Sequence, residues 1–246
     1  MKKMLTLFCL SIFSFTFSQT AEEIIRKYVE VSGGINKVNN IKNFHSSAKV
    51  EQMGMTIPVD IYTTSEGKML IKVVVQGMEF VQMAFDGKES WGTNFMTMKP
   101  EKSSSEESEN MKRNSKDFMS PLFNYKEKGY QIEKMSDETV EGVSCFKLKV
   151  SKGTLLDNSA EVQNIDYFYI DKENYLLILQ ESEITSGEMK GKMEQSVFSD
   201  YQEINGVLFP FSMTSRIKDV GGQTIQFDKI ETNITLDEKM FSFPEQ

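Results

Sequence analysis

The sequence predicts a mainly β protein of the α+β class, in which an antiparallel meander of about a dozen strands follows one early helix. Two observations support this class. Helical periodicity is strong only near the N-terminus, and from Phe44 onward apolar residues recur with period two, as in half-buried strands. The connections are short turns rather than helices, which excludes a βαβ fold.

The first 18 residues read as a secretory signal peptide. "MKKMLTLFCLSIFSFTFSQT" has two lysines, an apolar run from Met4 to Phe17 and small residues before Gln19. The run is shorter than the ~20 residues that span a bilayer. We expect cleavage near Ser18/Gln19, export to the periplasm, and one domain over residues 19–246; a core helix is the competing interpretation.

The number of cysteines and the net charge limit the classes of function that this chain could have. If Cys9 leaves with the signal, Cys145 is the one cysteine that remains, and it is read as a small apolar filler in a strand. The formal charge is −8, and removal of Lys2 and Lys3 makes it −10. An acidic chain without a basic cluster is a poor nucleic-acid binder, so no nucleic-acid partner is expected.

The expected N-terminal helix begins in "TAEEIIRKYVEV". Thr20 and Glu23 have capping-box spacing, and Ile24, Ile25 and Tyr28 recur on one face. Gly33 and Gly34 can end this helix, and a short second helix is expected from Ile35 to Ile41.

Five strands should follow in the first half of the chain. Asp86-Gly87, which lies between two apolar runs, is a strong hairpin signal. The expected strands are Phe44–Gln52, Met55–Thr64, Lys68–Val75, Met78–Phe85 and Glu89–Asn94.

The rhythm stops between Met98 and Gly129, where Ser, Glu and Lys replace the apolar residues. We expect a mobile acidic insert at about 99–116 that leads into a short helix near Ser115–Phe123. An interdomain linker is the other interpretation, but too few strands stand on either side for two independent sheets.

Hairpins resume in the second half, with turns such as "DKEN", "INGV" and "DVGG". The expected strands are Tyr130–Met135, Glu141–Ser151, Gln163–Ile170, Tyr175–Thr185, Lys190–Ser199, Val207–Ile217 and Thr224–Ile234.

Several strands are apolar on both faces, as in "MEFVQMAF", "YLLIL" and "GVLFPF". A sheet with one wet face alternates cleanly, so both faces need a cover. One cover can be the helix; the other is a second layer of core or a ligand. Pro210 inside such a strand indicates an edge, a bend or an unpaired stretch. The 16 methionines fit either a large core or an adaptable binding surface.

Residues for catalysis are scarce. His45 is the only histidine, no motif of a hydrolase or nucleotide-binding protein is present, and no metal site or cofactor is expected. A hydrolase that uses His45 is the weakest of the functional hypotheses.

Four segments, in order, resemble exported lipoprotein-sorting proteins related to the outer-membrane carrier LolA, of the LolA/LolB-like superfamily. They are "FDGKESWGTNFMTMKP", "FYIDKENYLLILQE", "FSDYQEINGVLFPFSMTSR" and "ITLDEKMFSFP". The resemblance implies a strongly curved sheet that forms an incomplete β-barrel, with the N-terminal and mid-chain helices covering its concave side. It also implies an apolar cavity for acyl chains. The arginine latch of the best-studied carriers has no counterpart in an early strand here.

The main hypothesis is therefore a monomeric, non-enzymatic periplasmic protein that binds and carries lipid acyl chains or lipoproteins in outer-membrane biogenesis. The alternative is an envelope sensor or interaction module of the same fold that binds a protein partner, with envelope membrane proteins as candidates. The residues predicted to line the cavity are Phe80, Met83, Phe85, Trp91, Phe95, Phe168, Leu177, Phe209, Phe211 and Met213.

Overall fold

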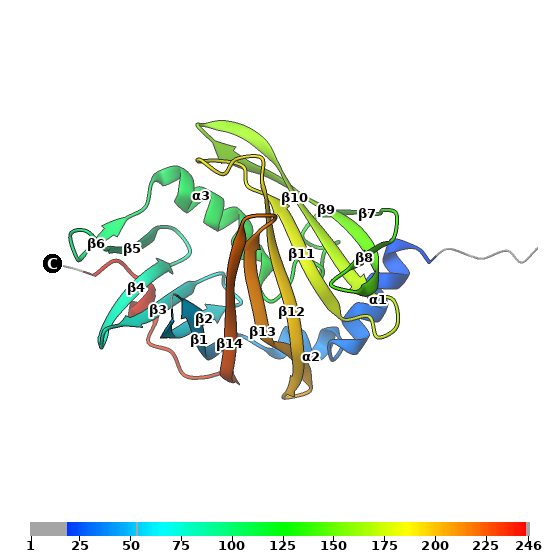
Figure 1. The fold of residues 1–246 in the computed structure, drawn as a ribbon, viewed down its shortest axis with the longest axis horizontal. Helices are drawn as coiled ribbons and strands as arrows, with labels where there is room; N and C mark the ends of the chain where they lie inside the picture. The colour runs from blue at the N-terminus through cyan, green and yellow to red at the C-terminus, as the bar shows by residue number, and fades with distance from the viewer. Residues whose placement is uncertain (1–18, 53, 245–246) are drawn as a thin grey trace, which may run out of the picture.

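A computed structural model describes residues 19–52 and 54–244 of the chain. The predicted signal peptide, residues 1–18, lies outside these described residues. All strands belong to one antiparallel sheet that stays open, with the order β6-β5-β4-β3-β2-β1-β14-β13-β12-β11-β10-β9-β7 and β8 beside β9 (Figure 1). The predicted mainly β class and antiparallel meander are confirmed.

Most strand boundaries agree closely with the period-two pattern, but two strands continue past their predicted ends, at Ser151 and Ser199. The strands are β1 Asn43–Gln52, β2 Met55–Thr64, β3 Met69–Val75, β4 Met78–Phe85, β5 Ser90–Asn94, β6 Lys99–Lys102, β7 Gln131–Lys134, β8 Glu138–Val140, β9 Val143–Asp157, β10 Ala160–Asp171, β11 Leu177–Glu183, β12 Met193–Ile204, β13 Val207–Ile217 and β14 Gly221–Thr232. The short strands β6 and β8 were not expected, because their sequences are mostly polar or charged.

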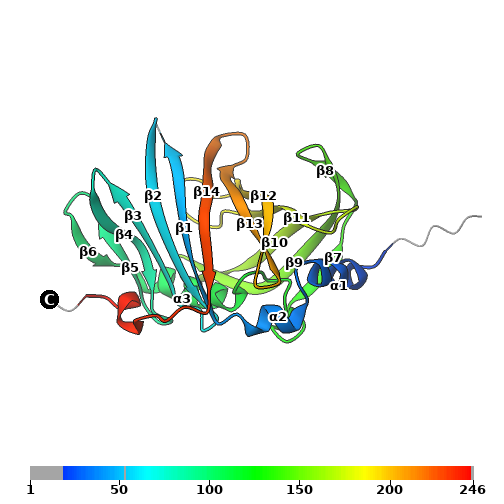
Figure 2. The same ribbon diagram turned by 90° about the horizontal axis from the view of Figure 1, so that it is seen from below.

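Helix α1 (Ala21–Val31) has the predicted capping box, in which Thr20 and Glu23 satisfy each other's backbone N–H groups. Its buried face, which includes Ile24 and Tyr28, packs with helix α2 (Ile35–Asn40) and the turn around Phe123 against strands β9, β10 and β13. Figure 2 shows both helices along one side of the sheet. The predicted helical cover of one face is confirmed.

The acidic segment differs from the expected loop. Residues Ser105–Asn114 form helix α3, with a second capping box between Ser104 and Glu107. A 3-10 turn, η1 (Ser115–Asp117), follows in place of the predicted helix near Ser115–Phe123. The mobility of this segment stays a prediction.

Helix α3 bridges the two halves of the open sheet. On one side, the hydroxyl of Ser108 accepts the backbone N–H of Ser90 in β5. On the other, Asn110 exchanges two hydrogen bonds with the backbone of Leu156, and Arg113 donates to Thr154, both in β9. These long-range contacts compensate for a helix that has few apolar residues.

Pro210 lies where the sheet splits. Strand β13 pairs with β14 only from Ser212 to Ile217. In the unpaired part, the N–H of Leu208 donates to the carbonyl of Ser32 at the end of α1. Residue 210 directs its backbone nitrogen to the same side of the strand, and proline has no N–H to leave unsatisfied there.

The end of α1 can approach this split because residue 33 is glycine. Gly33 has φ +118°, and a Cβ there would lie 2.2 Å from the carbonyl oxygen of Gly206. A side chain would therefore push the helix end away from β13.

The opposite, convex face has separate covers. Over β3–β5, the C-terminal segment that contains η2 (Glu238–Phe241) buries Leu70, Ala84 and Trp91 under Phe241. Over β9–β11, Cys145, Tyr169 and Leu179 form a small cluster.

Candidate functional site

The concave face of the sheet holds an apolar pocket of about 270 Å³ beside the split between β13 and β14. Its wall is mainly aromatic and aliphatic. It comprises Tyr28, Ser32, Phe44, Ser46, Ile61, Thr63, Met119, Ser120, Phe123, Leu177, Gln180, Phe198, Tyr201, Leu208, Phe209, Pro210, Met213, Phe227 and Ile230. A ligand in this pocket would touch the sheet, the end of α1 and the turn around Phe123.

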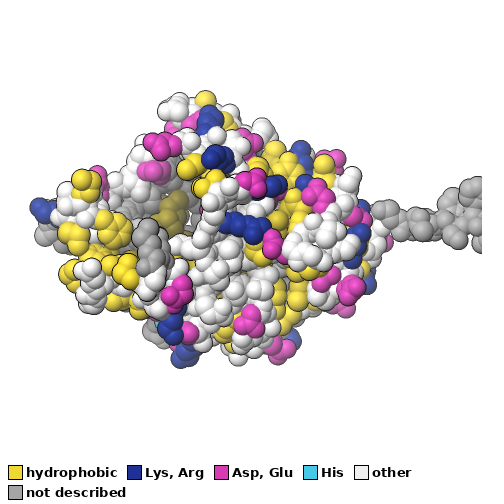
Figure 3. All heavy atoms as spheres, in the orientation of Figure 1, with side chains coloured by type: hydrophobic (Ala, Val, Ile, Leu, Met, Phe, Trp, Pro, Cys, Tyr) yellow, Lys and Arg dark blue, Asp and Glu magenta, His cyan; other side chains and the backbone are white. Residues whose placement is uncertain are grey.

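A second apolar hollow of about 230 Å³ continues along the concave face of β1–β4. Val50, Val59 and Val73 lie at its base, and the ring of Phe95, from the β5–β6 turn, lies 5.7 Å from that of Phe80. Figure 3 shows hydrophobic side chains gathered over the β3–β6 region beside a hollow.

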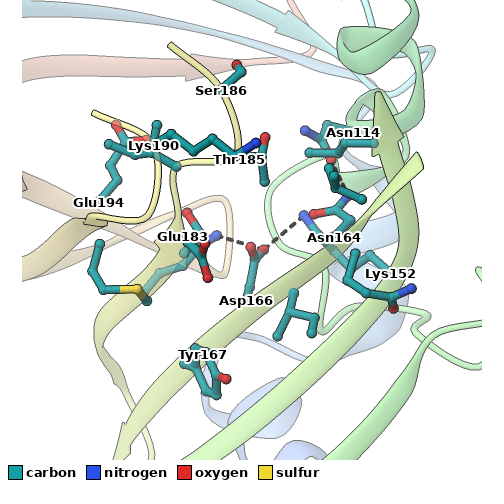
Figure 4. Close-up of a pocket in the computed structure, with 18 residues that line it drawn as sticks. Asn114, Lys152, Asn164, Asp166, Tyr167, Glu183, Thr185, Ser186, Lys190 and Glu194 are labelled. Carbon is teal, nitrogen blue, oxygen red and sulfur yellow. Dashed lines mark hydrogen bonds and ion pairs between the residues drawn. The ribbon is translucent and has the colours of Figure 1, made fainter. Parts of the chain in front are cut away.

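A larger, polar pocket of about 590 Å³ lies over β10–β12. Figure 4 shows Asn164 and Asp166 from β10 facing Thr185, Ser186 and Lys190 of the β11–β12 connection. Its wall holds two lysines, three carboxylates, four side-chain amides and several hydroxyls.

A buried ion cluster closes the floor of the polar pocket. The ammonium of Lys152 lies 2.8 Å from Asp166 and 3.0 Å from Asp117, and Asp117 also accepts a hydrogen bond from Tyr130. Burial alone would lower the pKa of Lys152, but the two carboxylates outweigh it, so the pKa is raised. The cluster ties the segment after α3 to the concave side of β9 and β10.

The structure brings together only part of the predicted cavity wall. Leu177, Phe209 and Met213 line the apolar pocket, and Phe95 lines the second hollow. Phe80 packs against the base of that hollow, and Met83 lies three positions further along β4, opposite Ile71.

Other predicted residues are core. Phe168 and Phe211 are buried in the main core beneath the helices, and Phe85 is fully buried beside Met69 and Ser90. Trp91 requires a correction, because it lies on the convex face, where its indole N–H donates to the carbonyl of Phe241 at 2.9 Å. Both faces of β5 are covered, so alternation could not tell the inside from the outside.

Sequence reasoning missed much of the pocket wall. Phe44, Phe198 and Phe227 lie on strands that were predicted, but their inward orientation depends on which face α1 covers. Met119 and Phe123 come from the segment between η1 and β7, which carries no periodic pattern. Once one inward residue is known, register identifies its neighbours: Met213 faces Phe198 and Ile225.

His45 lies on the convex face, away from these pockets. Its ring stacks on Tyr62, and its Nε2 lies 2.6 Å from Asp60. Ser47 donates to the same carboxylate rather than to the histidine, so the three do not form a nucleophile–base–acid relay.

The thiol of Cys145 is buried, and this burial raises its pKa to about 11. Within residues 19–52 and 54–244, no cluster of three or more His, Cys, Asp or Glu could hold a metal ion. No helix among the residues described is both long and apolar enough to cross a membrane.

Solved structures of other proteins have the same architecture. A LolA superfamily protein from Nitrosomonas europaea matches with a TM-score of 0.55 and 12% identity, over 92% of this chain and 98% of that one. This chain has a LolA-like fold. The predicted resemblance and the incomplete barrel are confirmed at the level of structure.

Two further structures share the LolA-like fold. A DUF1329 family protein from Desulfovibrio piger has a TM-score of 0.55 and 15% identity, over 92% of this chain and 98% of that one. A domain assigned to outer membrane lipoprotein sorting, from Vibrio parahaemolyticus, has a TM-score of 0.53 and 13% identity, over 89% and 94% of the two chains. No family model matches this chain, and no curated protein matches it by sequence.

Proposed function

We propose that this protein binds and carries lipids or lipoproteins in the periplasm, without catalysing a reaction on them. The observation that carries the proposal is the open apolar pocket between the concave sheet and the end of α1. The LolA-like fold, which includes a lipoprotein-sorting domain among its solved examples, supports the same function.

The chemistry of the pocket suits an acyl chain. Its wall is formed mostly by Phe, Ile, Leu and Met side chains. Each methylene transferred from water to such a wall contributes about 0.8 kcal/mol, so a chain of several methylenes needs few polar contacts for binding.

The empty space on the concave side favours lipid carriage over the alternative function, which is a sensor that binds only a protein partner. A sensor needs no internal space, and its concave side would be filled by side chains. Here the apolar pocket and the neighbouring hollow leave about 270 and 230 Å³ empty. The apolar pocket and the adjoining polar pocket of about 590 Å³ together fall within the roughly 300–1,000 Å³ typical of small-molecule sites.

A route for the lipid is suggested by the exposed hydrophobic side chains. In the part of the chain that the structure describes, those that are large and exposed lie in or beside turns at one end of the sheet: Met55, Met78, Phe95, Met96, Met98, Met189 and Val220. Phe95 also lines the second hollow, so this end of the sheet is continuous with the apolar interior.

The test is uptake of a fluorescent fatty acid, together with native mass spectrometry of protein purified from the periplasm. Met213→Glu places a carboxylate in the apolar pocket and should abolish uptake. Thr214→Glu is the matched control, because Thr214 lies on the other face of the same strand, where its hydroxyl is hydrogen-bonded to the hydroxyl of Thr224. It should bind as the parent protein does.

Two results would contradict the proposal. One is a parent protein that carries no co-purified lipid and takes up no fatty acid. The other is equal uptake by Met213→Glu and Thr214→Glu, which would mean that the probe binds outside the pocket.

A further inference from the structure

Gln180 lines both the apolar and the polar pocket, so the two spaces adjoin on the concave face. In the register of the sheet, Gln180 stands opposite Phe168 on β10 and Ser196 on β12. Its amide donates to Asp166 at 3.1 Å, which fixes its orientation at the boundary between the pockets.

The concave face changes character at this level on four neighbouring strands. Toward α1 its side chains are apolar; toward the β9–β10 and β11–β12 turns they are polar. The change runs from Phe146, Leu148 and Val150 to Lys152 on β9, from Ile170 and Phe168 to Asp166 and Asn164 on β10, from Leu177 to Gln180 and Ser182 on β11, and from Phe198 to Ser196 and Glu194 on β12.

If these side chains only formed a core, the change from apolar to polar would not need to occur at the same level on all four strands, nor beside an open cavity. Two adjoining spaces, one apolar and one polar, match the two ends of an amphiphile. The apolar end would be held by burial and the polar end by hydrogen bonds.

The charges of the polar pocket disfavour an anionic group. Lys152 is already paired with Asp166 and Asp117, and Lys190 with Asp157. Among the described residues, Glu183 and Glu194 make no ion pair, so the wall has a surplus of negative charge.

The uncharged part of the wall offers both donors and acceptors. The amides of Gln163 and Gln180 and the hydroxyls of Ser182, Thr185 and Ser186 lie around the pocket. A group with several hydroxyls, each both donor and acceptor, satisfies such a wall without burying a charge.

We infer that the polar pocket receives an uncharged, polyhydroxylated headgroup of the sugar type, carried by a lipid whose acyl chain lies in the adjoining apolar pocket. This inference rests on the proposed lipid-binding function and specifies the class of lipid.

The experiment compares three ligands with identical acyl chains, bound to the whole protein: a diacylglycerol, the same diacylglycerol bearing one glucose, and the same diacylglycerol bearing phosphoglycerol. The glucosyl lipid should bind about tenfold more tightly than the bare diacylglycerol, as two or so net hydrogen bonds would give. The anionic lipid should bind least tightly. Free methyl glucoside should not compete, because it lacks the acyl chain.

Variants separate the headgroup contact from the acyl contact. Ser182→Val removes a hydroxyl from the polar pocket and should reduce the preference for glucose severalfold, with diacylglycerol binding unchanged. Ser212→Val is the matched control, since Ser212 lies on a β-strand between Phe211 and Met213 and faces away from the pockets. Glu183→Gln combined with Glu194→Gln should raise affinity for the anionic lipid.

Equal affinity for the glucosyl lipid and the bare diacylglycerol overturns this inference and leaves the proposed function standing. A preference for the anionic lipid also overturns it. Failure of all lipids and of the fatty-acid probe would instead overturn the proposed function itself.

Discussion

The two halves of the sheet differ in which parts of their concave and convex faces are apolar and in what covers them. In β1–β4 the concave face is mainly apolar, and the C-terminal segment covers the convex face of β3–β5. In β9–β12 the concave face is apolar under α1 but polar beyond Gln180, where an ion cluster replaces hydrophobic packing. The difference teaches that one sheet can present an apolar or a polar concave face, depending only on how far apolar side chains extend along each strand.

The largest expected effect comes from the ion cluster. Lys152→Met leaves Asp166 buried without its cation and leaves Asp117 with Lys128 alone, at 3.6 Å, which should lower the free energy of unfolding by about 3–5 kcal/mol. Urea unfolding measures it. Lys72→Met, which breaks an exposed pair with Glu79 in the other half, is the control and should cost less than about 1 kcal/mol.

The same variant should respond to pH. Burial already raises the pKa of Asp166, and loss of Lys152 raises it further. The native state then binds more protons than the unfolded state between neutral pH and the ordinary carboxyl range near 4. Stability therefore rises as pH falls through that window, and the deficit of Lys152→Met should shrink. A deficit that stays constant down to pH 4 would assign the loss to packing instead.

Gly33→Ala tests the junction between the halves. Its φ of +118° and the 2.2 Å approach to the Gly206 carbonyl should together cost about 2–3 kcal/mol. The displaced end of α1 lies at the wall of the apolar pocket, so fatty-acid uptake should fall as well. Gly34→Ala is the comparison, because a Cβ there meets no atom within 4 Å, although its φ is also positive. Equal losses in both variants would mean that backbone strain alone, and not contact with β13, matters.

These tests bear on how much could be predicted from the sequence. Period-two alternation predicted the long strands, because each has alternating apolar residues over at least part of its length. It could not assign faces where both are covered, as in β5, and Trp91 was therefore placed on the wrong side. Helix α3 has few apolar residues for a periodic stripe; its capping box at Ser104 and Glu107 was the available local signal. Its contacts with β9 come from residues more than 40 positions away, which no local pattern encodes.

Trp91→Phe sharpens the distinction between the faces. The carbonyl of Phe241 loses its donor, which should cost about 1–2 kcal/mol of stability. Because Trp91 lies on the convex side, uptake of fatty acid should remain that of the parent protein. A loss of uptake with stability unchanged would return Trp91 to the cavity wall.

The smallest expected effect tests whether the halves open independently. Cys145 is buried on the convex face of β9, and its raised pKa of about 11 keeps the thiol protonated near pH 8. Iodoacetamide should label it only when that half opens, since the thiolate is the nucleophile. Under native conditions, Lys152→Met should accelerate labelling, whereas Trp91→Phe should leave the rate nearly unchanged. Equal acceleration by both would mean that the sheet opens as one cooperative unit, so that the contrast between the halves is one of chemistry and not of stability.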